Sequence, residues 1–117
     1  GQAYITVAYP SVVKAWHYHK IQTDNFICIK GNAKVVLCDN RKDLPTYKKI
    51  NEFFIGKKNP ILLTIPNHVW HGFKAIGGKE AVILNCPTEL YNYDNPDEYR
   101  LPYDAKEIGY DWEIKMG

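Results

Sequence analysis

The chain has 117 residues, of which 45% are hydrophobic and 24% charged, and its formal net charge at pH 7 is +2. That length fits a single domain over residues 1–117 and excludes two separate hydrophobic cores. The sequence contains no run of about 18 apolar residues and opens with no signal peptide, so we expect a soluble, cytoplasmic protein with no membrane partner.

Short segments rich in strand-forming residues follow one another, and no segment of useful length has a helical period. In chain order, the expected strands are residues 3–9, 13–19, 25–30, 33–39, 61–66, 69–75 and 81–86. Gly31-Asn32 and Gly77-Gly78 are expected to form tight hairpin turns, and residues 39–45 and 51–60 to contain polar loops. This pattern predicts an all-β sandwich or barrel, with residues 91–117 as an ordered tail that wraps the barrel mouth and contains one short helix.

The charge distribution narrows the class of ligand, and the cysteine usage indicates the cellular compartment. Residues 14–58 hold ten Lys and Arg against four acids, whereas residues 80–117 hold three against nine. A basic front half favours an anionic ligand, and the lack of an RNA-binding motif or a basic helix argues against nucleic acid. Cys28, Cys38 and Cys86 are odd in number and follow no C-x-x-C spacing, so we expect buried free thiols in a reducing compartment.

All four histidines lie in two short runs, His17-Tyr-His19 and His68-Val-Trp-His71. His17 and His19 alternate at strand spacing, so their rings should leave the same face of a sheet. Together with Asp24, these runs resemble the two motifs of the cupin superfamily, whose members are antiparallel β-barrels of jelly-roll type with a pocket inside. Asp24 stands where those motifs usually carry Glu, and His68 where they usually carry Gly.

Six short segments resemble, in one consistent order, motifs of one cupin family, the dTDP-4-dehydrorhamnose 3,5-epimerases. They are Val-Val-Lys-Ala-Trp-His-Tyr at 12–18, Asp39-Asn-Arg41 with Pro45-Thr46-Tyr47, the run 65–73, and the closing segments 100–104 and 108–112. Family members carry additional residues ahead of the first motif, so the resemblance identifies an N-terminally short member.

The resemblance implies an epimerase of deoxysugar biosynthesis that acts on a dTDP-linked 4-keto-6-deoxy sugar, requires no cofactor and forms a homodimer. Epimerisation beside a keto group needs a base on one face of the sugar ring, an acid on the other face and donors for the enolate oxygen. His17 falls on the family's catalytic histidine, and Asp104 is the candidate for the aspartate that orients it. Tyr91 falls near the family's catalytic tyrosine, with Tyr93 as the second choice.

Lys14, His19, Asp24 and His71 are the expected substrate-binding residues. Lys14 replaces an arginine of the family, which keeps a positive charge for a diphosphate but loses bidentate geometry. His71 should line the pocket floor. Counted back from Gly31, Asp24 occupies the position of the family's catalytic lysine, and His19 that of a usual glutamine. A carboxylate cannot stabilise an enolate as an ammonium does, so another group, another substrate or another chemistry is implied.

Three alternatives remain open from the sequence. One is a metal-dependent cupin enzyme, in which three imidazoles and one carboxylate bind Fe, Mn, Ni or Zn: His17, His19, Asp24 and His71. Another is a dTDP-4-keto sugar 3,4-ketoisomerase, because residues 17–20 also resemble that branch. The third is a non-catalytic sugar-binding cupin. For His68 we favour a structural role, since it should lie on the opposite face from His71.

Overall fold

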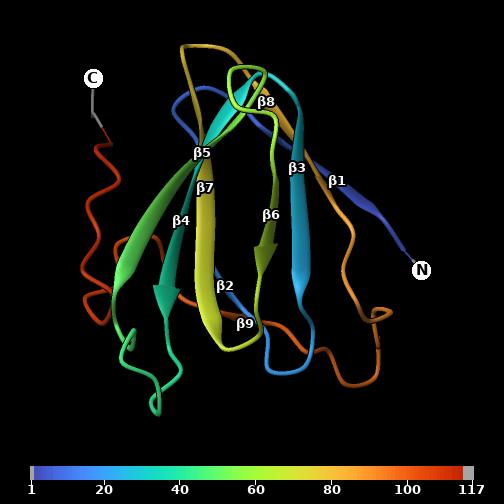
Figure 1. The fold of residues 1–117 in the computed structure, drawn as a ribbon, viewed down its shortest axis with the longest axis vertical. Coiled ribbons are helices and arrows are strands. Elements are labelled where there is room, and N and C mark those ends of the chain that lie inside the picture. The colour runs from blue at the N-terminus through green and yellow to red at the C-terminus, as the bar shows by residue number, and fades with distance from the viewer. Residues whose placement is uncertain (1, 115–117) are drawn as a thin grey trace.

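The computed structural model describes residues 2–114, which form two antiparallel β-sheets packed against each other (Figure 1). This arrangement confirms the predicted all-β jelly-roll. No helix is present between residues 2 and 114, so the short helix predicted in the tail is wrong. Accordingly, no helix in this part of the chain is long and apolar enough to cross a membrane.

The two sheets contain nine strands. The four-stranded sheet has the spatial order β1 (Tyr4–Ala8), β8 (Ala81–Asn85), β3 (Asp24–Lys30) and β6 (Leu62–Ile65). The five-stranded sheet has the order β5 (Ile50–Gly56), β4 (Asn32–Asp39), β7 (Val69–Ile76), β2 (Val13–Tyr18) and β9 (Tyr99–Arg100). The seven predicted strands are all present, whereas β5 lies in a region expected to contain a loop and β9 was not predicted.

The glycine turns connect the two sheets and do not form hairpins. Gly31 joins β3 of one sheet to β4 of the other, and Gly77-Gly78 joins β7 to β8 in the same manner. The hairpin prediction is therefore wrong, because a turn signal alone does not say whether the next strand stays in the same sheet. Gly31 has a φ of 71°, and a Cβ there would lie 2.2 Å from the carbonyl oxygen of Glu80, so only glycine fits.

The hydrophobic core fills the space between the sheets, and the tail covers a second, outer cluster. Val35 and Val36 are neighbours on β4 and both fully buried, although their side chains leave opposite faces of the strand. Val35 belongs to the core between the sheets, whereas Val36 packs with Trp16 and Trp112. The rings of Trp16 and Trp112 lie 5.2 Å apart, and Lys74 Nζ donates to the Trp112 carbonyl at 2.6 Å. The tail is thus held across the outer face of the five-stranded sheet.

The family-like loop after β4 is held by Asp39. Its carboxylate accepts from the backbone N–H of Arg41 at 2.9 Å, from the Arg41 side chain at 2.8 and 2.7 Å, and from the Thr46 hydroxyl. The Arg41 guanidinium holds the pKa of the Asp39 carboxyl well below its usual range. These residues of the motif therefore close the loop between β4 and β5.

The three cysteines are all free thiols. Cys28 and Cys38 are buried, as expected, whereas Cys86 is exposed, so its predicted burial is wrong. Cys86 follows the last residue of β8, where the chain leaves the sheet for the tail.

Candidate active site

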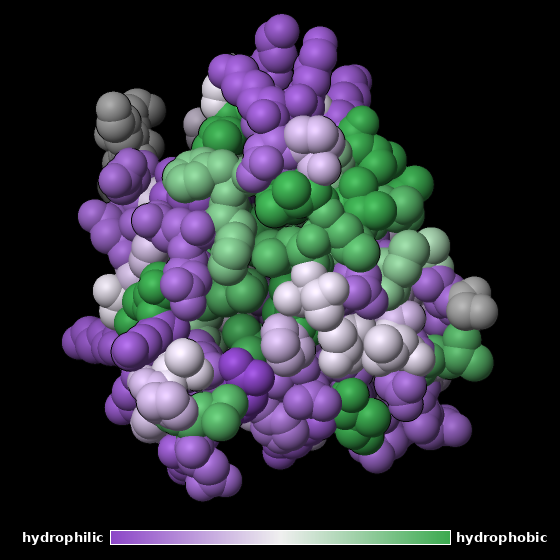
Figure 2. All heavy atoms as spheres, in the orientation of Figure 1, coloured by the Kyte–Doolittle hydropathy of each residue, from purple (hydrophilic) through white to green (hydrophobic). Residues whose placement is uncertain are grey.

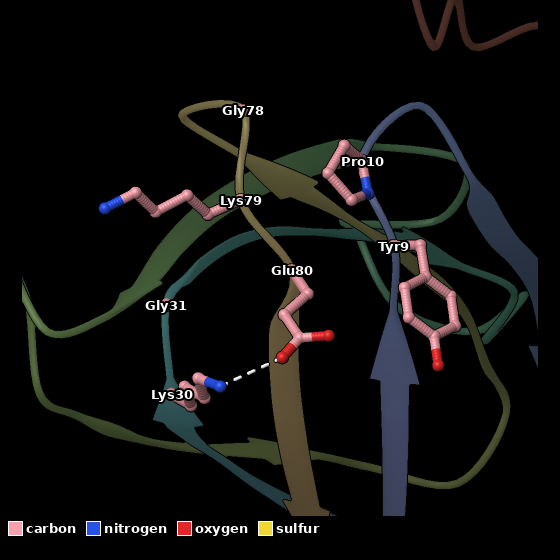
Figure 3. Close-up of a pocket in the computed structure, with 7 residues that line it drawn as sticks. All are labelled: Tyr9, Pro10, Lys30, Gly31, Gly78, Lys79 and Glu80. Carbon is pink, nitrogen blue, oxygen red and sulfur yellow. Dashed lines mark hydrogen bonds and ion pairs between the residues drawn. The ribbon is translucent and has the colours of Figure 1, made fainter.

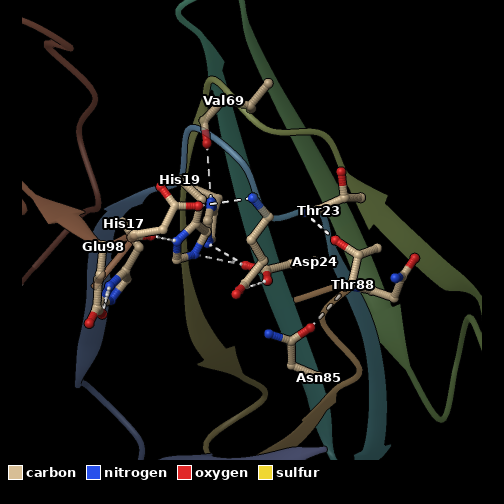
Figure 4. Close-up of polar contacts among 12 residues, drawn as sticks. His17, His19, Thr23, Asp24, Val69, Asn85, Thr88 and Glu98 are labelled. Atoms are coloured by element: carbon tan, nitrogen blue, oxygen red, sulfur yellow. Dashed lines mark hydrogen bonds and ion pairs between the residues drawn. The ribbon is translucent and has the colours of Figure 1, made fainter. Parts of the chain in front are cut away.

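Four sequence-predicted site residues come together at one end of the sandwich (Figure 4). His17 lies near the end of β2, Asp24 begins β3, and His71 lies near the start of β7. His19 follows the last residue of β2. The His71 ring lies 6.0 Å from the His17 ring and 5.4 Å from the His19 ring, measured between centroids. The ends of β2 and β7 in one sheet and of β3 in the other thus place the imidazoles of His19 and His71 against the Asp24 carboxylate, with His17 beside them.

Asp24 is at the centre of the cluster and only 2% exposed. Its Oδ2 atom lies 3.2 Å from His19 Nε2 and 3.1 Å from His71 Nε2, while its Oδ1 atom accepts from Gln22 Nε2 at 2.6 Å. Burial alone would raise the pKa of Asp24, but its contacts with His19 and His71 more than offset this effect and hold the pKa far below its usual value. Asp24 is therefore a buried, ionised carboxylate.

Backbone carbonyl oxygens contact the Nδ1 atoms of the His19 and His71 rings. His19 Nδ1 lies 2.6 Å from the carbonyl oxygen of Asp97, and His71 Nδ1 lies 3.1 Å from that of Val69. A carbonyl oxygen can only accept a hydrogen bond, so Nδ1 carries the proton in both rings. Burial lowers the pKa of His19, but the contact with Asp24 and the bond to the Asp97 carbonyl raise it more, and the net shift is upward.

His17 lies beside this cluster with a different set of partners. On β2 it stands opposite His71 of β7 on one side and Arg100 of β9 on the other. Its Nδ1 atom lies 3.5 Å from Oε1 of Glu98. Burial, followed by the charges of His71 and Arg100, lowers the pKa of His17 to about 4. His17 is therefore a neutral imidazole at pH 7, able to accept a proton.

The carboxylate beside His17 comes from Glu98, which the sequence analysis did not select. Glu98 Oε1 also accepts from Arg100 Nη2 at 2.9 Å, so it links His17 to Arg100. Asp104, the predicted partner of His17, is exposed in the turn after β9, and within residues 2–114 it makes no ion pair with His17. The only sequence signal for Glu98 was its place just ahead of the family-like segment at 100–104.

Asp97, the neighbour of Glu98, fixes the segment that joins His19 to Asp24. Its carboxylate accepts the backbone N–H groups of Lys20, Ile21 and Gln22 at 2.8, 2.9 and 2.9 Å. Burial alone would raise the pKa of Asp97, but these three donors offset it and bring the pKa below its usual value. The tail therefore holds the site from outside through two consecutive acids.

The structure does not bring Lys14 or Tyr91 into this cluster. Lys14 lies on β2 opposite Phe73, and Tyr91 is 41% exposed with its ring 4.6 Å from that of Tyr93. Within the described chain, neither side chain makes a hydrogen bond or ion pair with the three clustered histidines. Their predicted roles therefore remain predictions.

His68 lies in the turn before β7, with a φ of 62°. Its Nδ1 atom lies 3.1 Å from the side-chain oxygen of Asn67, and its ring packs edge-on against Tyr18 at 5.8 Å. These contacts fit the structural role favoured from the sequence.

A surface hollow of about 410 Å³ lies at the opposite end of β3 from Asp24 (Figure 3). Its lining includes Lys30 and Glu80, which pair with each other at 2.9 Å, and it contains no histidine. This hollow therefore offers no imidazole for proton transfer.

Comparisons with known proteins give a consistent result. The model of a family described as dTDP-4-dehydrorhamnose 3,5-epimerase matches residues 1–117. The probable low-salt glycan biosynthesis epimerase Agl13 of Haloferax volcanii is 45% identical over 115 residues, which cover 97% of this chain and 74% of that protein. The spore coat polysaccharide biosynthesis protein SpsL of Bacillus subtilis is 42% identical over 116 residues, which cover 99% of this chain and 77% of that protein. The crystal structure of a dTDP sugar isomerase from Desulfovibrio desulfuricans superposes with a TM-score of 0.90 at 34% identity, covering 96% of this chain and 71% of that chain.

Proposed function

The chain belongs to the dTDP-4-dehydrorhamnose 3,5-epimerase family, and we propose that it is a nucleotide-sugar epimerase in which His17 is the catalytic base. Its substrate is a dTDP-linked 4-keto-6-deoxy sugar, from which a proton beside the keto group is removed and then returned on the opposite face. The family and the enzyme class predicted from the sequence are confirmed. A ketoisomerase and a non-catalytic sugar-binding module are not favoured by these relationships.

The assignment of His17 as the catalytic base rests on its pairing with Glu98. A general base must be unprotonated at the working pH, and burial together with the nearby charges of His71 and Arg100 lowers the pKa of His17 to about 4. Its Nδ1 atom faces Glu98 at 3.5 Å, which leaves Nε2 to take the proton. As the ring becomes an imidazolium, the Glu98 carboxylate stabilises the new charge and holds the ring in place.

Return of the proton requires an acid on the other face of the sugar. We assign this role to Tyr91, with Tyr93 as the second candidate, on the basis of its position in the sequence. A phenol is a suitable donor because its hydroxyl can give a proton to a developing carbanion and then recover it from water. Lys14 supplies positive charge for the diphosphate, and His19, Asp24 and His71 contact the sugar.

The exposed outer face of the four-stranded sheet supports a homodimer. Ile5, Leu84, Ile27 and Leu62 stand directly opposite one another on β1, β8, β3 and β6, so they form one apolar row across the sheet. Ile5 and Leu62 are 66% and 59% exposed. Figure 2 shows apolar side chains gathered where Figure 1 shows β1, β3 and β6. We propose that a second copy of the chain covers this face, since monomers rarely expose such continuous apolar surface.

We propose a cytoplasmic location on the basis of the three free thiols. Disulfides persist in oxidising compartments, and free cysteines are the rule in the cytoplasm. Cys28, Cys38 and Cys86 are all free, which supports a cytoplasmic enzyme.

The experiment that tests this function is incubation with dTDP-4-keto-6-deoxyglucose in deuterated water. Mass analysis of the sugar should show deuterium at C3, at C5 or at both, and NMR should show inversion at the labelled carbon. A folded protein that introduces no label would exclude enolisation of this substrate. Label found only at a carbon not adjacent to the keto group would exclude the proposed mechanism.

A further inference from the structure

Trp16 is the residue before the proposed base His17, and it binds the tail through both its backbone and its side chain. Its backbone N–H donates to the Leu101 carbonyl at 2.9 Å, and its backbone carbonyl accepts from the Leu101 N–H at 3.2 Å. Its indole Nε1 donates to the Tyr103 carbonyl at 3.2 Å. The side chain is fully buried in the outer cluster with Val36, on the face of the sheet opposite to His17. Trp16 therefore ties the tail to the strand that carries the base.

The end of the tail is held on the same outer face by aromatic packing and two hydrogen bonds. The centroid of the Trp112 ring lies 5.2 Å from that of Trp16 and 4.9 Å from that of Tyr110. Lys74 Nζ of β7 donates to the Trp112 carbonyl at 2.6 Å, and the Tyr110 hydroxyl donates to the Glu52 carboxylate of β5. Buried aromatic rings contribute much of the energy of such a contact. The tail is therefore docked along the sheet, with Trp16 at the centre of the contact.

Glu98 lies between two anchors of the tail. On one side, Asp97 accepts three backbone N–H groups from the segment that follows β2. On the other side, Leu101 is bonded to Trp16 through both backbone groups. The Oε1 atom of Glu98 lies 3.5 Å from Nδ1 of His17, at the outer limit of a hydrogen bond (Figure 4). A small displacement of the tail therefore breaks this contact.

We propose that Trp16 is a positioning residue of the active site, which docks the tail so that Glu98 faces Nδ1 of His17. This contact decides the tautomer of His17, because a carboxylate that accepts from Nδ1–H leaves the lone pair on Nε2. Nε2 is the atom that must take the proton from the sugar. Trp16 faces away from the histidines, so it acts only through Glu98. The positional half of the proposal concerns the folded protein alone, whereas the catalytic half rests on the proposed function.

Trp70 provides a matched comparison on the same face of the sheet. It precedes His71 on β7 as Trp16 precedes His17 on β2, and its ring packs against that of Tyr18 at 4.7 Å. Within residues 2–114, the indole that donates to the tail is that of Trp16 and not that of Trp70. Replacing Trp70 therefore changes the same kind of side chain beside an active-site histidine, while the hydrogen bonds of the tail stay in place.

The positional half is tested by nitrogen NMR of the histidine rings near neutral pH, without substrate. The shifts of the two ring nitrogens report which of them carries the proton, and in the wild type we expect the His17 proton on Nδ1. Trp16→Phe keeps an aromatic ring but removes the bond to Tyr103, and Lys74→Met keeps the aliphatic stem but removes the bond to Trp112. Both variants should move the proton of His17 towards Nε2.

Two further variants and a folding check complete this experiment. Glu98→Ala removes the carboxylate itself and should move the proton of His17 to Nε2 most completely. Trp70→Phe should leave the tautomer as it is in the wild type. Circular dichroism and thermal unfolding establish that each variant is folded, and Lys74→Met keeps the test decisive if Trp16→Phe does not fold.

The catalytic half is tested by kcat and KM for deuterium exchange into dTDP-4-keto-6-deoxyglucose. Trp16→Phe should lower kcat by about 3- to 10-fold, as loss of one neutral hydrogen bond allows, while KM stays close to that of the wild type. In a Glu98→Ala background, Trp16→Phe should cost no further activity, because a residue that acts only through Glu98 then has nothing to position. Trp70→Phe should stay within about twofold of the wild type.

The outcomes separate the two halves. A folded wild type with the His17 proton on Nε2 overturns the proposal, and so does an unchanged tautomer in the folded Trp16→Phe and Lys74→Met variants. A tautomer change of the same size in Trp70→Phe overturns it as well. Equal losses of kcat from Trp16→Phe with and without Glu98 overturn the catalytic half. The expected tautomers without exchange in any form of the protein support the positional half and instead count against the proposed substrate.

Discussion

Replacing Asp97 with asparagine should destabilise the chain and loosen the active site together. The carboxylate accepts three backbone N–H groups, from Lys20, Ile21 and Gln22. Hydrogen bonds to a charged group contribute about 1.5–3 kcal/mol each, but water can replace an exposed acceptor. The bonds to Lys20 and Ile21 are exposed and that to Gln22 is partly buried, so we expect a total loss of about 2–3 kcal/mol.

The assay is thermal and chemical unfolding of Asp97→Asn beside Asp94→Asn, an exposed aspartate of the same tail segment. For a chain of this size, a loss of about 2–3 kcal/mol lowers Tm by roughly 8–12 °C. Because the pKa of Asp97 is lowered by folding, its contribution is present above the unfolded pKa of about 3.9 and is lost as the pH falls through the folded value. The difference between wild type and Asp97→Asn should therefore shrink below about pH 4. Equal stability of the two variants at pH 7 would refute this reasoning.

Three further predictions concern the base, the acid and the dimer. The acid limb of kcat/KM should have an apparent pKa well below 6.5, because burial, His71 and Arg100 lower the pKa of His17 to about 4; a limb at 6.5 or above would assign the base elsewhere. Tyr91→Phe should let deuterium enter the sugar with little inversion, as followed by mass analysis and NMR, whereas full epimerisation by this variant would transfer the acid's role to Tyr93. Ile27→Lys should place a charge in the apolar row and convert a dimer into a monomer in light scattering, while a monomeric wild type would rule out the proposed interface.

The strands were predictable because their signal is local, and β5 shows where that signal fails. Its segment Ile50–Gly56 lies at the edge of the five-stranded sheet, and its first three residues are exposed. Two lysines precede it and two follow it. Edge strands carry little of the alternation that burial imposes on central strands, so the segment resembled a loop.

The site residues that stand in short motifs could be predicted from the sequence. A residue that only the fold brings to the site could not. His17, His19, Asp24 and His71 stand in short motifs, and the structure brings all four together. Glu98 reaches His17 from the position just before the two-residue strand β9, far along the chain. The pairing of Glu98 with His17 depends on how the tail crosses the sheet. No local residue spacing in the sequence encodes the course of the tail.

Solvent deuterium exchange by His17→Asn tests the central claim most directly, with His68→Asn as the matched control. Asparagine keeps the polarity of histidine but cannot take a proton near neutral pH, and loss of a general base typically costs about 10²–10⁴-fold. We predict that His17→Asn, folded like the wild type, loses label uptake into dTDP-4-keto-6-deoxyglucose by at least this factor, while His68→Asn retains most of it. Equal loss in both variants, or exchange by His17→Asn at the wild-type rate, would contradict the assignment of His17 as the base.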